Sequence, residues 1–183
     1  KLYIDQTGDL TVLLEPVPYF KDGQNLRGMG QDAAWTQDIL QKTASGAVYS
    51  GTILEHILLE TLCAVHETGA HGHIRLRGAD WNDALDMAAE HGESVAFTCA
   101  YAGNLEELAG LLRVLAERGH REVELLEELE LLLEKENRLP DFLRLCAHSV
   151  RGSKSRFDTL ALADTLQAMA ETEDTVLSEV AAL

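Results

Sequence analysis

The sequence predicts a mainly helical chain with short connections between the helices. Two long segments, 93–118 and 156–183, place apolar residues at the three- and four-residue spacing of a helix. A third segment, 52–68, has the same spacing. The chain has 183 residues, of which 46% are hydrophobic, so it is large enough to bury a core. We therefore expect an all-α fold with short irregular or strand-like connections.

The first fifty residues are predicted to be mostly irregular. Residues 2–9, "LYIDQTGD", resemble the last turn of a helix. Pro16 and Pro18 exclude a helix through "EPVPYF", because proline lacks the backbone N–H that a helix needs. Glycines follow at short intervals and are typical of turns. We expect a long connection over residues 8–49.

The segment 52–68 predicts a helix with marked ends. Its apolar residues recur at positions 54, 58, 62 and 65. Thr52 and Glu55 have the spacing of a capping box, in which each side chain accepts from the other's backbone N–H. Gly69 supplies a stop signal.

A short strand is predicted next. Ile74 and Leu76 alternate with polar residues in "HIRLR", and Gly78 ends the alternation. The acidic stretch that follows, "RGADWNDALD" at 77–86, is therefore expected on a loop.

The second half of the chain is predicted to hold further helices. In 93–118 the first half is apolar or small nearly all round, which is typical of a helix enclosed by other structure, and Gly119 ends it. Residues 121–136 read as a surface helix with a leucine-rich face. A helix beginning near Leu139 has Pro140 in its first turn. The last helix covers 156–183, with Ser155 as its N-cap.

Charge and composition exclude several classes of partner. The net charge is −16, which repels nucleic acid backbones and anionic membrane surfaces. No apolar run is long enough to cross a membrane and no secretion signal opens the chain, so we expect a cytoplasmic protein. Cys63, Cys99 and Cys146 have the apolar helical context of buried thiols. The chain lacks an initial Met and ends inside a helical pattern, so we expect a piece of a longer protein, cut at both ends.

The acidic stretch 77–86 has three interpretations. With His71 and His73 it suggests a metal site, but Ala84 stands where a calcium loop needs an acid or amide, so we expect no metal. A structural alternative makes Asp80 or Asn82 the cap of a helix with an acidic first turn. The third is a carbohydrate site, because the flat indole of Trp81 is a platform for a sugar ring or a core wall.

Two motifs resemble a known family. "DWND" at 80–83, followed by "GES" at 92–94, is similar to the inverting disaccharide phosphorylases of glycoside hydrolase family 94, which include the cellobiose, chitobiose, cellodextrin and 1,2-β-oligoglucan phosphorylases. The segments "TGDLTVLLEPVPYF" and "TILEHILLETL" resemble the same family and stand in the same order. The resemblance fades after the helix at 93–118.

The resemblance implies a fold, a site and substrates. The fold is an (α/α)6 barrel, of which this chain would hold about five helices. Asp83 is the general acid, Trp81 lines the site near the scissile bond, and Asp80 contributes to substrate binding by orienting the loop. The substrates are a β-linked glucose disaccharide or oligosaccharide and inorganic phosphate, with no cofactor, and the parent protein is a homodimer. Relatives often have Gly where this chain has Ala84, a change that leaves the acid in place.

Phosphorolysis by this family needs only one carboxyl group. Phosphate is already an anionic nucleophile, so the base of an inverting hydrolase is not required. Asp83 must keep its proton near neutral pH, so we expect its pKa to be raised by burial against Trp81 or by neighbouring acids. Arg75 and Arg77 are candidate phosphate ligands, but solvent-facing pairing with acids is favoured for them. The family's phosphate ligands lie beyond the matched region, so this chain alone is expected to be inactive.

Two other functions remain open. An inverting hydrolase on the same barrel would need a separate base, and a helical interaction module would use the leucine-rich segment 121–136. His56 and His66 are expected to be structural rather than catalytic. Glu93 is expected at the N-terminus of its helix, with sugar binding as a weaker alternative.

Overall fold

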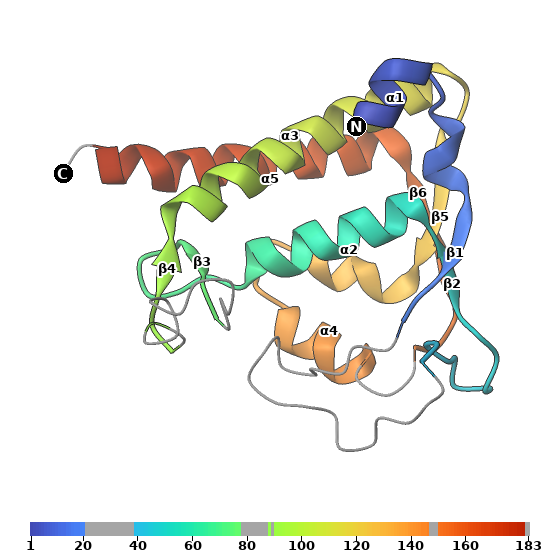
Figure 1. The fold of residues 1–183 in the computed structure, drawn as a ribbon, viewed down its shortest axis with the longest axis horizontal. Helices are drawn as coiled ribbons and strands as arrows, with labels where there is room; N and C mark the ends of the chain where they lie inside the picture. The colour runs from blue at the N-terminus through green and yellow to red at the C-terminus, as the bar shows by residue number, and fades with distance from the viewer. Residues whose placement is uncertain (21–38, 78–87, 89, 147–149, 182–183) are drawn as a thin grey trace.

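The computed structural model describes residues 1–20, 39–77, 88, 90–146 and 150–181. Two long helices, α3 (Val95–Glu117) and α5 (Thr159–Ala181), pack along each other. Helix α2 (Ile53–His66) lies beside this pair, and short elements surround it (Figure 1). The prediction of a mainly helical fold with short strand-like connections is confirmed, and the (α/α)6 barrel stays a prediction.

The N-terminal segment contains more regular structure than predicted. Helix α1 (Leu2–Thr7) ends as expected, at a left-handed Gly8 with φ 70°. A 3-10 turn, η1 (Thr11–Leu14), leads to strand β1 (Pro16–Pro18). This strand pairs antiparallel with β2 (Ser50–Thr52), which directly precedes α2.

Helix α2 confirms one half of the predicted capping box. The Thr52 side chain accepts a hydrogen bond from the Glu55 backbone N–H at 3.1 Å. The Glu55 carboxylate does not return the bond, because it is buried and accepts from the hydroxyls of Tyr19 and Tyr49 and from the Leu126 N–H. The helix ends at His66, so the end predicted from Gly69 was too late in the sequence.

The predicted strand at 74–76 is confirmed as β3 (Ile74–Arg75), paired antiparallel with β4 (Glu93–Ser94). Helix α3 then begins at Val95 and ends before Gly119, which has φ 102°. The enclosure predicted for its first half would come from structure beyond this chain, so it stays a prediction. Val95, Ala96, Cys99 and Ala100 are exposed, because only one side of these turns packs against other elements.

The predicted surface helix at 121–136 was wrong. Residues 122–126 form strand β5 (Glu122–Leu126), and the next residues form a 3-10 helix, η3 (Glu127–Leu133). The glutamates of β5 are exposed and alternate with buried Val123 and Leu125. In η3, buried Leu129 and Leu132 are three residues apart, the repeat of a 3-10 helix rather than of an α-helix.

The last helix begins later than predicted. Strand β6 (Lys154–Asp158) occupies the expected cap at Ser155 and pairs antiparallel with β5, so these residues are extended. Asp158 Oδ1 accepts from the Ala161 N–H at 2.8 Å, which gives α5 its N-terminal cap. The short helix α4 (Leu139–Cys146) has Pro140 in its first turn, as predicted.

One leucine-rich core joins these elements. Its fully buried side chains come from α2, α3, β5, η3 and α5, and include Leu58, Leu62, Leu112, Leu129 and Leu166. Cys63 and Cys146 are half-buried, whereas Cys99 is exposed, against prediction. In the described ranges, no helix is both long and apolar enough to span a membrane.

Candidate functional site

The predicted site residues Asp80, Trp81 and Asp83 lie outside the described residues. Asn82, Ala84 and Asp86, on which the alternative interpretations depend, lie outside them too. The structure describes the two flanks of this stretch, which are β3 with the residues to Arg77 on one side and the residues from Glu90 to β4 on the other. We refer to residues 78–87 as the motif segment.

The two flanks of the motif segment are hydrogen-bonded to each other. Ile74 pairs with Ser94 and Arg75 with Glu93 in the β3–β4 ladder. The Leu76 N–H then donates to the Gly92 carbonyl at 2.9 Å. The described residues on the two sides of the motif segment, 74–76 and 92–94, therefore form one hydrogen-bonded unit.

The base is also attached to helices α2 and α3. The Ile74 N–H donates to Thr98 Oγ1 at 3.0 Å, and Thr98 is fully buried in α3. The Arg75 N–H donates to the Glu67 carbonyl at the end of α2, at 2.9 Å. Ser94 caps α3 by accepting from the Phe97 N–H at 3.1 Å. The β3–β4 pair that flanks the motif segment is thus connected to two helices of the core.

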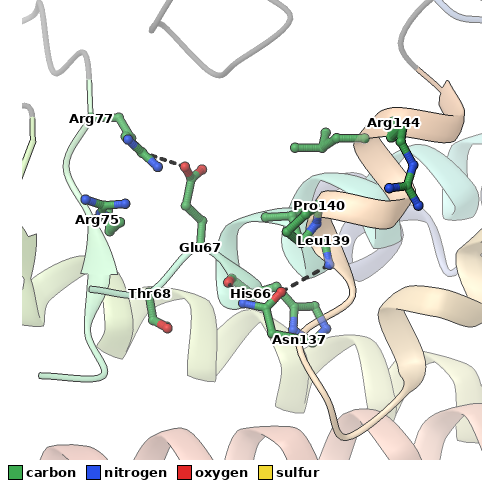
Figure 2. A pocket seen from close by; sticks show the side chains of 10 residues that line it. His66, Glu67, Thr68, Arg75, Arg77, Asn137, Leu139, Pro140 and Arg144 are labelled. Atoms are coloured by element: carbon green, nitrogen blue, oxygen red, sulfur yellow. Dashed lines mark hydrogen bonds and ion pairs between the residues drawn. The ribbon is translucent and has the colours of Figure 1, made fainter. Parts of the chain in front are cut away.

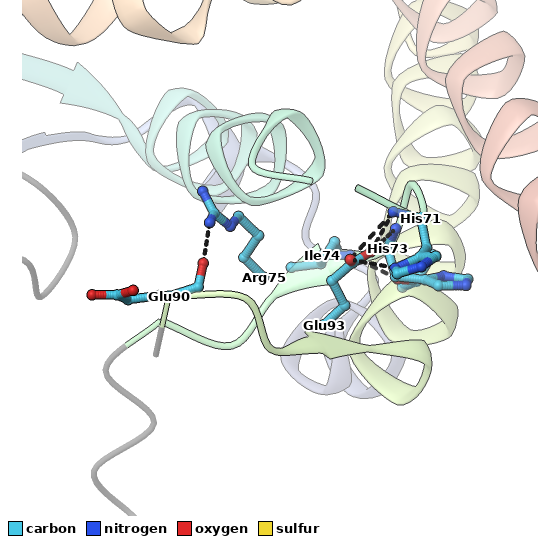
Figure 3. Close-up of polar contacts among 7 residues, drawn as sticks. His71, His73, Ile74, Arg75, Glu90 and Glu93 are labelled. Atoms are coloured by element: carbon cyan, nitrogen blue, oxygen red, sulfur yellow. Dashed lines mark hydrogen bonds and ion pairs between the residues drawn. The ribbon is translucent and has the colours of Figure 1, made fainter. Parts of the chain in front are cut away.

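Glu93 holds the turn that precedes β3 (Figure 3). Its carboxylate accepts from the backbone N–H groups of His71 and His73, at 3.2 and 3.0 Å, and contacts His71 Nδ1 at 3.0 Å. A side chain at Gly69 would overlap this carboxylate. Burial works to raise the pKa of Glu93, but the hydrogen bonds from His71 and His73 outweigh it and lower the pKa. Glu93 directly precedes Ser94, the cap of α3, but its carboxylate holds the turn before β3 rather than the helix N-terminus.

The histidines of this turn have different surroundings. His71 is exposed apart from its contact with Glu93, whereas His73 is buried and its Nδ1 has no hydrogen-bond partner among the described residues. In that part of the chain, no three His, Cys, Asp or Glu side chains are grouped to hold a metal ion.

A pocket of about 620 Å³ lies beside the first flank of the motif segment (Figure 2). One wall is formed by the end of α2 and by Arg75 and Arg77. Arg77 Nε donates to Glu67 Oε1 at 2.6 Å, and both side chains are largely shielded from solvent, at 18% and 11% exposure. Arg77 also has a φ of 50°, which is uncommon for a residue with a side chain, and such strain is concentrated at functional sites.

The facing wall comes from α4 and the residue before it. Leu139, Pro140 and Leu143 present an apolar surface, and Arg144 lies at its edge. Asn137 joins the two walls, because its side chain donates to the His66 carbonyl and accepts from the Leu139 N–H. The pocket thus combines segments about seventy residues apart in the sequence.

The two arginines ahead of the motif segment differ from their prediction. Arg77 does pair with an acid, Glu67, but the pair is shielded rather than solvent-facing. Arg75 donates through Nη2 to the Glu90 carbonyl, and its buried Nε has no hydrogen-bond partner among the described residues.

The structural interpretation of the helix histidines agrees with their contacts. His66 Nε2 contacts the Leu132 carbonyl at 2.7 Å and is buried. His56 stacks on the Tyr19 ring, with ring centroids 3.5 Å apart, and its Nε2 lies 3.3 Å from the Val17 carbonyl. Both rings connect α2 to neighbouring segments of the chain.

Comparison with known proteins gives one informative similarity. The chain is 32% identical over 111 residues to the cyclic β-(1,2)-glucan synthase NdvB of Rhizobium meliloti (strain 1021). The similar region covers 61% of this chain and 4% of that protein, so the chain spans only a small part of this relative's length. No protein-family model matches the chain.

Proposed function

We propose that this chain is part of the catalytic domain of a glucan-active enzyme that transfers glycosyl groups. The observation that carries the proposal is the 32% identity to a cyclic β-(1,2)-glucan synthase over 111 residues. The same chain contains "DWND" and "GES" in the order found in the inverting phosphorylases that it resembles. The mainly helical fold is compatible with that family, whose catalytic domain is built from helices.

Within this class, we infer an inverting phosphorolysis. A phosphate oxygen attacks the anomeric carbon from the face opposite to the leaving oxygen, and the glycosidic C–O bond breaks. Asp83 gives its proton to the leaving oxygen, so a β-glucoside yields an α-glucosyl phosphate and a shortened sugar. Trp81 lines the sugar site, and Asp80 helps bind the substrate by orienting the loop.

The described flanks support this assignment through positioning. A general acid must lie within hydrogen-bond reach of the leaving oxygen, and small displacements lower the rate strongly. The β3–β4 ladder and Glu93 together hold the described flanks of the motif segment, residues 73–76 and 92–94, against α2 and α3. Flanks held in this way are compatible with the positioning that a general acid requires.

The reaction type is tested with the protein that contains this chain. A β-1,2-linked gluco-oligosaccharide is incubated with and without inorganic phosphate, and the products are followed by proton and phosphorus NMR. We expect α-glucose 1-phosphate, formed only when phosphate is present.

Two other outcomes have clear meanings. Free glucose released at the same rate without phosphate would identify an inverting hydrolase, the second candidate. If neither condition produces cleavage or glucosyl transfer, the enzyme assignment itself is contradicted.

A further inference from the structure

We propose that the outer edge of strand β6 is a contact surface for a second copy of this chain, whose own β6 pairs with it as an antiparallel strand. Strand β6 belongs to a two-stranded sheet in which β5 is its only neighbour among the described strands. This sheet lies where α5 begins, at one end of the α3–α5 pair (Figure 1). The inference concerns assembly and does not depend on the proposed reaction.

Two hydrogen bonds at the ends of the β5–β6 ladder show which groups of β6 face away from β5. The Thr159 N–H donates to the Arg121 carbonyl at 2.9 Å, and the Glu127 N–H donates to the Ser153 carbonyl at 3.1 Å. Both pairs keep the register of the ladder, so every second residue from 153 to 159 is hydrogen-bonded to β5. The N–H groups of residues 154, 156 and 158 therefore point to the outer edge.

This outer edge is open among the described residues. The N–H groups of Lys154, Arg156 and Asp158 donate no hydrogen bond to that part of the chain. Their side chains are exposed and alternate with half-buried Ser155 and Phe157. A strand edge with free backbone groups is a template for a further strand, because the incoming backbone satisfies those groups.

The charges along β6 are complementary to those of a second β6 in one arrangement. Antiparallel pairing about a twofold axis at Arg156 places Lys154 of each copy opposite Asp158 of the other. The two Arg156 side chains meet at the axis, and each is offset by its own Glu124 and Glu122, at 3.4 and 3.8 Å. Parallel pairing in register would instead place every charge beside its like, which is unfavourable.

In this arrangement the backbone supplies the affinity and the charges supply the register. The Arg156 residues exchange two hydrogen bonds across the axis, and the Asp158 N–H of each copy donates to the Lys154 carbonyl of the other. Exposed ion pairs add little affinity but disfavour a shifted pairing. So short a contact buries less surface than a permanent interface, so we expect a weak, reversible dimer.

The first test measures the mass of the protein that contains this chain by sedimentation equilibrium, over about 1–200 µM to cover weak dimers. Arg156→Pro removes the outward N–H at the axis but no hydrogen bond to β5, so the ladder is retained. Lys154→Glu sets an acid opposite Asp158 of the other copy. Lys135→Glu makes the same charge reversal at an exposed position after η3 and is the matched control.

We expect the wild type and Lys135→Glu to dimerise with the same dissociation constant. Arg156→Pro should be monomeric throughout, and Lys154→Glu should raise the dissociation constant about tenfold, because the repulsion acts twice in a symmetric dimer. A monomeric wild type, or variants with native circular dichroism that dimerise like the wild type, overturns the inference. If Arg156→Pro does not fold, the Lys154→Glu result decides.

The second test examines the register by cross-linking in a Cys99→Ser background, because Cys99 is exposed. The twofold axis places the two residues 156 opposite each other, with Cα atoms about 5.5 Å apart, which a disulfide can span. Oxidation by dissolved oxygen should therefore join two copies of Arg156→Cys. Lys154→Cys is the control, since residue 154 faces residue 158 of the other copy. Equal cross-linking of the two variants on a non-reducing gel, or none in either, contradicts this pairing.

Discussion

Glu93 is a shielded carboxylate whose charge is used to hold the turn before β3. It accepts from two backbone N–H groups, of which that of His71 is shared by both oxygens, and an amide offers only one acceptor oxygen and no charge. Glu93→Gln should therefore lower the free energy of unfolding by about 1–3 kcal/mol at neutral pH, measured by urea denaturation. The control Glu90→Gln, at an 85% exposed side chain in the same flank, should have no measurable effect.

The contribution of Glu93 should depend on pH in a defined direction. Because its pKa is lower in the folded state than the ordinary value of 4.5, its stabilisation is complete above that value. It is lost as the pH falls through the lowered pKa. The stabilities of the wild type and Glu93→Gln should begin to approach each other below about pH 4.5 and converge only below the lowered pKa, and a difference that persists there would contradict this account.

A second buried carboxylate, Glu55, is held by tyrosine hydroxyls. Burial raises the pKa of Tyr49, and the neighbouring Glu55 carboxylate adds to this effect, so the hydroxyl stays a hydrogen-bond donor. Tyr49→Phe should cost about 1.5–3 kcal/mol in the free energy of unfolding, since it removes a hydrogen bond to a buried charge. Tyr101→Phe is the control, because the Tyr101 hydroxyl has no hydrogen bond to described residues. Equal losses in the two variants would show that the carboxylate does not need this donor.

At the level of single residues, the sequence indicated the motifs but not which residues form hydrogen bonds with each other. Asp83 and Trp81 are predicted site residues because they belong to a contiguous tetrapeptide. The partners of Glu93 lie about twenty residues away, and Leu126, which donates to Glu55, lies 71 residues away. Such contacts depend on the packing of whole elements and leave no local signal.

At the level of elements, the cap of α3 connects the motif segment to the core. Ser94 is the last residue of β4 and accepts from the Phe97 N–H, so it belongs to both elements. Ser94→Ala should reduce the free energy of unfolding by about 1 kcal/mol in chemical denaturation. Ser178→Ala makes the same change at an exposed position inside α5, where the hydroxyl only bonds back to Asp174. A loss of equal size at both serines would contradict the capping role.

The elements that the sequence predicted well have local signals at their ends. Thr52 begins α2, Gly119 follows α3, and Pro140 lies in the first turn of α4. The helix predicted over 121–136 was wrong because the spacing of its leucines also fits a strand and a 3-10 helix. Pairing with β6 made its first part a strand, and β6 itself displaced the start of the last helix. Strand pairing across about thirty residues overrode local helix preference.

At the scale of the whole molecule, the sequence predicted the helical class and the order of the motifs, but not the pocket. Its walls come from α2, β3 and α4, and the Asn137 side chain that joins them belongs to no recognisable motif. The similar region covers only 4% of the glucan synthase, so the activity of the protein that contains this chain is a proposal. The candidate acid could be named from sequence because its motif is contiguous, while the pocket required the folded arrangement.

The central claim is that Asp83 protonates the leaving oxygen in the protein that contains this chain. The direct test compares Asp83→Asn with Asp86→Asn, the same change three residues later, on two substrates. With a β-1,2-linked glucobiose and phosphate, we expect Asp83→Asn to lower kcat by about 10²–10⁴-fold, the usual contribution of a general acid. With β-glucosyl fluoride, whose leaving group needs little proton donation, Asp83→Asn should keep most of its activity. Full activity of Asp83→Asn on the glucobiose, or an equal loss on both substrates, would contradict the claim.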